Sequence, residues 1–128
     1  MKIQSASPDG QNLITSYDAD TITVNGVAYH SSLIVTPQRV ISPWPCSDIS
    51  ELDAAAIESL AEFADSIIVL GTGPKQHFPA TAVLREFRAR GMAVEVMDSH
   101  AACRTYNILV TEARKVVAAL MIAPRAAA

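Results

Sequence analysis

The sequence has few cysteines and no long apolar run. It contains two cysteines, Cys46 and Cys103, which are too few for a disulfide scaffold or a four-thiolate metal site. We expect both to be buried free thiols, and a disulfide between them is the alternative. No apolar run approaches the ~20 residues that cross a bilayer, so no membrane span is expected.

The start of the chain also lacks targeting signals. The first ten residues show neither the charged-then-apolar pattern of a secretory signal nor the arginine-rich pattern of a transit peptide. We therefore expect a cytoplasmic protein. Hydrophobic residues make up 50% of the 128 residues and charged residues 18%, which indicates a globular chain of one domain.

The net charge of −3 is unevenly divided along the chain. Residues 1–65 contain two basic and nine acidic residues, a net charge of −7, and residues 66–128 contain eight basic and four acidic residues, a net charge of +4. If the two halves lie apart, an acidic and a basic side could pair with a partner or a second copy. A solvated surface on each half is the simpler interpretation. The basic half has no Lys/Arg cluster interleaved with aromatic residues, so nucleic acid is not an expected partner.

The N-terminal block, residues 1–42, reads as β-structure. Asn25-Gly26 predicts a hairpin turn, because both turn positions need positive φ. Runs rich in β-branched residues predict strands over 11–17, 21–24, 27–29, 32–36 and 40–42.

Residues 43–65 are expected to form a rigid loop and a first helix. The loop, Pro43-Trp44-Pro45, contains the single tryptophan. Trp44 either folds back as a lid over the core or makes an exposed contact at an interface, where Trp is enriched, so it is a candidate partner contact. A helix over 52–64 follows, with Asp53 as its cap.

Residues 66–122 are expected to alternate strands and helices around a glycine loop. The predicted order is a strand over 67–70, the loop Gly71–Gly73, a helix over 79–90, a strand over 93–97, a helix from Asp98 and a strand over 116–122. The loops of such an α/β unit meet at one edge of the sheet, where ligands bind in open α/β folds. Residues 123–128 are expected to fray.

Gly71-Thr72-Gly73 follows a strand, the right context for close approach of a backbone or an anion. Position 76 is glutamine, so the third glycine of a dinucleotide fingerprint is missing, and no Gly-Lys-Ser/Thr follows to make a phosphate loop. We expect a tight turn with close packing and no cofactor.

The helix from Asp98 presents a polar face beside this loop. Four side chains stack along that face in helical projection: His100, Arg104, Asn107 and Thr111. Such a ladder can hold a carboxylate or phosphate, and the simpler interpretation is that Arg104 and Asn107 tie the neighbouring loop to the helix. The candidate cleft residues are Gly71, Thr72, Gly73, Asp98, Arg104, Thr105 and Asn107.

The residues that usually carry catalysis are poorly placed. Cys103 falls on the apolar arc of its helix with no base beside it, which argues against a nucleophile. The three histidines share no metal-ligand spacing, and no carboxylates are paired for acid–base work. We therefore expect no catalytic residue and no metal, and a non-enzymatic role is favoured.

Several segments strongly resemble a small domain-of-unknown-function family. They are Gly71-Thr72-Gly73, Val94-Glu95-Val96-Met97-Asp98 and Ala101-Ala102-Cys103-Arg104-Thr105-Tyr106-Asn107, while Asn25-Gly26, Tyr29, Ser32-Leu33-Ile34-Val35 and Trp44 fit the family's N-terminal half. The family is typified by an uncharacterised methanogen protein and includes the mitochondrial assembly factor 3 of respiratory complex I (NADH dehydrogenase). The resemblance implies a three-layer α/β domain: a mixed central sheet with helices packed on it and an additional N-terminal β-hairpin layer.

The resemblance also implies a function. The family has no established catalysis, its mitochondrial member acts as an assembly partner, and its cleft is placed between residues matching Gly71–Gly73 and Arg104–Asn107. We therefore expect a small binding or assembly protein with a protein partner. The alternative is a small anionic-ligand-binding protein or an undiscovered enzyme that uses this cleft. Without a mitochondrial presequence, the chain resembles a bacterial relative.

Overall fold

The computed structural model describes residues 10–123. The elements in chain order are β1 Ile14–Tyr17, β2 Ile22–Val24, β3 Val27–Tyr29, β4 Leu33–Val35, β5 Val40–Ile41, η1 Ile49–Glu51, α1 Ala54–Leu60, η2 Ala61–Phe63, β6 Ile67–Gly71, α2 Thr81–Ala89, β7 Ala93–Met97, α3 Ser99–Thr111 and β8 Val116–Leu120.

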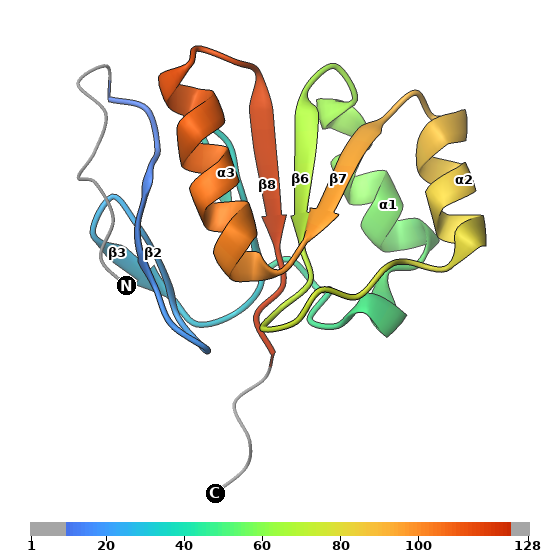
Figure 1. The fold of residues 1–128 in the computed structure, drawn as a ribbon, viewed down its shortest axis with the longest axis horizontal. Helices are drawn as coiled ribbons and strands as arrows, with labels where there is room; N and C mark the ends of the chain where they lie inside the picture. The colour runs from blue at the N-terminus through green and yellow to red at the C-terminus, as the bar shows by residue number, and fades with distance from the viewer. Residues whose placement is uncertain (1–9, 124–128) are drawn as a thin grey trace, which may run out of the picture.

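The strands form two sheets. The larger sheet has the order β5-β4-β8-β6-β7, with β4 antiparallel to β5 and β8, and β6 parallel to β7 and β8. The smaller sheet is the antiparallel β1-β2-β3. Helices α1 and α2 lie on one side of the larger sheet, and α3 and the small sheet lie on the other (Figure 1). The mixed central sheet with helices and an N-terminal β-hairpin layer is thereby confirmed.

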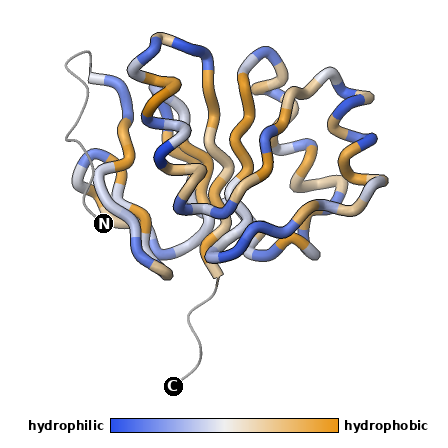
Figure 2. The backbone as a smooth tube through the Cα atoms, viewed as in Figure 1, coloured by the Kyte–Doolittle hydropathy of each residue, from blue (hydrophilic) through white to orange (hydrophobic). Residues whose placement is uncertain are grey.

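Strand β8 shows how the larger sheet separates two cores. Val116, Ala118 and Leu120 lie in the core under α3 and the small sheet. The alternate residues Val117 and Ala119 lie in the core under α1 and α2. Every residue of β8 is buried, as expected of a strand covered on both faces. The central strands are correspondingly hydrophobic (Figure 2).

The N-terminal block divides between the two sheets. Asn25 and Gly26 form the predicted hairpin turn with φ of 48° and 84°. Strands β4 and β5 instead join the larger sheet, with β4 beside β8. The two halves of the chain therefore interleave, and ion pairs between Glu58 and Arg90 and between Asp65 and Lys115 connect them. The two halves do not lie apart, which was the condition for an acidic side and a basic side of the molecule.

Trp44 is not an exposed contact. Its side chain is 2% exposed and packs in the core under α1 and α2. Its indole Nε1 donates a hydrogen bond of 2.9 Å to Ser59 Oγ on α1, which satisfies the one polar group that burial would otherwise leave unpaired. The expectation of a partner contact was wrong, and the lid interpretation is confirmed.

Some sequence-based expectations fall at the chain ends. The expected lack of targeting signals concerns residues 1–10, of which 1–9 lie outside the described residues. The predicted fraying concerns residues 123–128, of which 124–128 lie outside them. Within residues 10–123, no helix is both long enough and apolar enough to cross a membrane.

Candidate functional site

The carboxyl ends of β6, β7 and β8 meet at one edge of the larger sheet (Figure 1). Gly71, the last residue of β6, stands in register with Met97 of β7 and Leu120 of β8. The loop 72–80 and the first turn of α3 leave from this edge. We call it the C-terminal edge, and it is where open α/β sheets bind their ligands.

Gly71 allows α3 to begin directly against the end of β6. A Cβ atom at this position would lie 2.8 Å from Ser99 Oγ and 2.9 Å from Ser99 Cα, closer than van der Waals contact permits. The expected close packing of the glycine loop is confirmed. It makes the loop and the helix start one rigid unit.

The polar groups of this unit bond to each other. Gly73 N donates a hydrogen bond of 2.9 Å to Ser99 Oγ, which in turn donates one of 2.9 Å to the Met121 carbonyl oxygen. Ser99 N donates to the Gly73 carbonyl oxygen at 2.8 Å. The Gly73 N–H is thus already used within the fold, and a bound anion would have to displace Ser99 to reach it.

Thr72 and Asp98 also serve the fold. Thr72 Oγ1 donates to the Lys75 carbonyl oxygen at 2.7 Å and accepts from His77 N at 3.0 Å, which shapes the loop 72–80. The Asp98 carboxylate caps α3 by accepting from Ala101 N at 2.8 Å.

Asn107 and Arg104 have different surroundings. Asn107 is buried, accepts from Ile14 N at 2.9 Å and donates to the Ile14 carbonyl oxygen at 2.8 Å. It therefore ties α3 to β1, and not to the glycine loop as the simpler interpretation expected. The Arg104 side chain is exposed and makes no hydrogen bond or ion pair with residues 10–123. Thr105 beside it is half-buried.

A cleft of about 240 Å³ opens beside the start of α3. It is lined by the end of β1, Gly73, the first turn of α3 and the residues that follow β8. The rings of Tyr17 and His100 lie there with centroids 4.1 Å apart and a tilt of 48°. Partial desolvation and the positive charge of Arg104 lower the pKa of His100. Of the residues predicted for the cleft, only Gly73 lines it.

Sequence reasoning missed Phe78, the most exposed large hydrophobic side chain of the described residues, at 69% exposure. It lies in the loop 72–80, which follows the C-terminal edge from β6 to α2 (Figure 1). One signal could have identified it: an aromatic residue after the polar run Lys75-Gln76-His77, outside any apolar period.

Residues 14–121 match the family described as "Protein of unknown function (DUF498/DUF598)". The chain belongs to this family. A relative in Rattus norvegicus, named NADH dehydrogenase [ubiquinone] 1 alpha subcomplex assembly factor 3, is 36% identical over 114 residues, which are 87% of this chain and 60% of the relative. The chain therefore spans about three fifths of the length of that relative.

Solved structures of other proteins share the DUF498/DUF598 fold seen here. A crystal structure of a Bordetella parapertussis protein has a TM-score of 0.80 and 33% identity, covering 91% of this chain and 99% of the other. An NMR structure of a Xanthomonas campestris protein has a TM-score of 0.81 and 30% identity, covering 100% of this chain and 97% of the other.

The two thiols of this DUF498/DUF598 protein are free and buried, as expected. Burial, followed by the charge of Asp98, raises the pKa of Cys103 to about 12. Burial, followed by the charge of Glu51, raises the pKa of Cys46 to about 12. Neither thiol is poised for nucleophilic attack, because the thiolate is the reactive form. Within residues 10–123, no group of three His, Cys, Asp or Glu side chains could together bind a metal ion.

We predict that both thiols react slowly with Ellman's reagent in the native protein. At pH 8, a pKa of about 12 leaves roughly one thiolate in ten thousand, against about a quarter for an ordinary thiol. The rate should rise with pH up to the point of unfolding, and denaturant should release two thiols at once. Rapid labelling of the native protein at pH 7 would contradict the assigned burial.

Proposed function

We propose that this chain is a non-enzymatic binding protein that assists the assembly of a larger protein complex. The names of the Rattus norvegicus and Homo sapiens relatives, at 36% and 35% identity, support an assembly role. The internal hydrogen bonding of the C-terminal edge supports binding in place of catalysis, because Thr72, Gly73 and Asp98 already use their polar groups within the fold.

The exposure of Phe78 carries this proposal. Its loop is anchored at its start by Thr72 Oγ1 and near its middle by Gln76 Nε2, which donates to the Val96 carbonyl oxygen at 3.1 Å. Pro79, buried, follows directly. An aromatic side chain on an anchored loop loses little conformational entropy when a partner covers it, and such residues dominate protein interfaces.

Arg104 is the second proposed contact. It lies on the exposed face of α3, one turn after His100, with no ion pair to residues 10–123. An unpaired arginine can form a bidentate bond with a carboxylate of a partner. We call the proposed binding surface the Phe78 surface, because Phe78 makes its apolar contact. Its other proposed members are Arg104 and Thr105 at its border and Gly71, Thr72, Gly73 and Asp98, which frame it.

The cleft of about 240 Å³ supports a second candidate function, a small-ligand site in which an undiscovered reaction could also take place. The Tyr17 and His100 rings favour a planar or partly apolar ligand. The cleft offers fewer contacts to an anion, because the Gly73 N–H already bonds to Ser99 and Arg104 does not line the cleft. A ligand of this cleft would raise the melting temperature of the wild type and not that of His100→Ala.

A cytoplasmic location stays a prediction from the sequence.

The experiment that tests the assembly role compares partner recovery by three tagged forms: wild type, Phe78→Ser and the control Arg85→Glu. Arg85 is exposed on α2, so the control changes surface charge outside the loop 72–80. Loss of one interface aromatic should lower affinity by at least about tenfold. We expect Phe78→Ser to recover little partner while Arg85→Glu recovers as much as the wild type. Equal recovery by all three forms, with equal melting temperatures, would contradict the proposal.

A further inference from the structure

A second hollow lies at the opposite edge of the larger sheet, where β6 and β8 begin. It has a volume of about 440 Å³ and is open to solvent. Four segments line it: Gln11 before β1, the turn between β4 and β5, the end of η2 with the residue before β6, and the turn between α3 and β8 with the start of β8. We call it the basic groove, because Arg39, Arg114 and Lys115 all line it and Glu62 is the one acidic lining residue.

The carboxylates nearby compensate this positive charge only in part. Arg39 pairs with Glu62 at 3.4 Å, and each side chain of that pair is 55% exposed. Lys115 pairs with Asp65, and both side chains are still more exposed. Exposed pairs of this kind contribute little to stability, so each cation can exchange its carboxylate partner for a carboxylate of a ligand. The Arg114 side chain makes no hydrogen bond or ion pair with residues 10–123.

The groove also has an aromatic wall. Phe63 is half-buried, and the guanidinium carbon of Arg39 lies 5.9 Å from the centroid of its ring. This contact restrains Arg39 at the groove. The restrained cation on the β4–β5 turn and the two cations on the α3–β8 turn come from separate segments.

We propose that the basic groove binds an acidic, extended segment of a protein partner. The cations come from two turns, which suits successive carboxylates along a chain better than one compact anion. The whole chain carries a net charge of −3, so overall attraction does not draw an acidic peptide to it. Binding must come from the local excess of Arg39, Arg114 and Lys115. This site is separate from the Phe78 surface, because it lies at the other edge of the sheet.

The test uses a fluorescein-labelled peptide of six glutamates, blocked at both ends, with binding followed by fluorescence anisotropy at low salt. A peptide of six glutamines is the matched probe. We expect saturable binding of the glutamate peptide, weakening as salt rises. Arg114→Glu should weaken binding roughly tenfold, and Arg114→Lys should weaken it less, because the charge is kept and the guanidinium fork is lost. Arg88→Glu, an exposed reversal on α2, should leave binding unchanged.

Three results would overturn the proposal. They are the absence of saturable binding by the glutamate peptide, equal binding of the glutamine peptide, and an equal loss in Arg114→Glu and Arg88→Glu. Citrate is a further probe, of a small anion. If citrate bound with the same dependence on Arg114 and the glutamate peptide could not displace it, the groove would be a small-anion site, and the proposal would also be overturned. Phe78→Ser should bind the glutamate peptide as the wild type does, so the two proposals can fail separately.

Discussion

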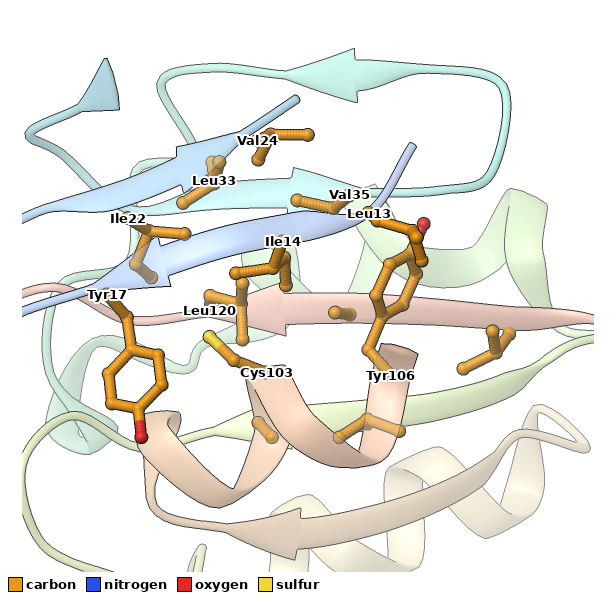
Figure 3. Packing of buried hydrophobic residues seen from close by; sticks show 14 of the residues in the cluster. Leu13, Ile14, Tyr17, Ile22, Val24, Leu33, Val35, Cys103, Tyr106 and Leu120 are labelled. Carbon is orange, nitrogen blue, oxygen red and sulfur yellow. The ribbon is translucent and has the colours of Figure 1, made fainter. Parts of the chain in front are cut away.

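Replacement of Tyr106 by alanine is expected to lower the free energy of unfolding by about 3–5 kcal/mol. The Tyr106 side chain has no exposed surface and packs in the core between α3, the small sheet and the larger sheet. Its ring is directed from α3 towards Leu13 (Figure 3). The hydroxyl donates a hydrogen bond of 2.8 Å to the Asn12 carbonyl oxygen. Alanine would leave a cavity at the junction of all three elements.

The melting temperature should fall by roughly 10–20 °C, measured by circular dichroism. Tyr106→Phe is the matched control, since it keeps the ring and removes only the hydroxyl. It should cost about 1–2 kcal/mol, because the Asn12 carbonyl oxygen loses its partner. A loss below about 1 kcal/mol for Tyr106→Ala would mean that α3 and the small sheet are not packed as described.

The second large effect is expected at Asn107. Its amide satisfies both the N–H and the carbonyl of Ile14, at 2.9 and 2.8 Å, inside the protein. Asn107→Ala would leave two buried backbone groups unpaired, and each costs about 1–3 kcal/mol. We expect a total loss of about 2–6 kcal/mol in chemical denaturation, with faster amide exchange at Ile14. Exchange at Ile14 that stays as slow as in the wild type would contradict the role of this bridge.

Asn107→Asp provides a control with a pH signature. Its carboxylate could accept from Ile14 N, but it would face the Ile14 carbonyl oxygen without a proton to donate. Protonation restores that bond, so the folded-state pKa should lie above the unfolded value of about 3.9. A raised carboxyl pKa means that the folded state binds more protons, so the stabilisation is present at low pH and is lost as pH rises through the folded pKa. The variant's deficit against wild type should therefore be smaller at pH 4.5 than at pH 7. A deficit independent of pH would contradict this.

Sequence patterns predicted the fold well because burial follows short-range periodicity. The buried strand β8 reads as a continuous apolar run, and α3 begins directly after Asp98, close to the predicted start. The pairing of β4 with β8 could not be predicted in the same way. It joins residues 33–35 to 118–120, and local preference carries no information on contacts so distant in the chain.

The candidate site was harder to predict, for reasons visible in single residues. Asn107 and Arg104 fall on one polar face in projection, yet β1 covers the first and leaves the second exposed. Trp44 and Phe78 show the same limit. Both are aromatic residues beside proline, and Ser59 on α1 offers the indole a partner while Phe78 stays 69% exposed. Exposure at such positions depends on tertiary packing.

The central claim is that the protein holds a protein partner through the surface around Phe78. Native mass spectrometry of the tagged protein, purified from its own host, tests it most directly, with Phe78→Ser and Arg104→Glu compared with the wild type. We predict a stoichiometric protein partner on the wild type that is lost in Phe78→Ser and reduced in Arg104→Glu. A small-molecule adduct on the wild type, retained in Phe78→Ser and accompanied by no protein partner, would contradict the claim and assign the function to the cleft beside α3.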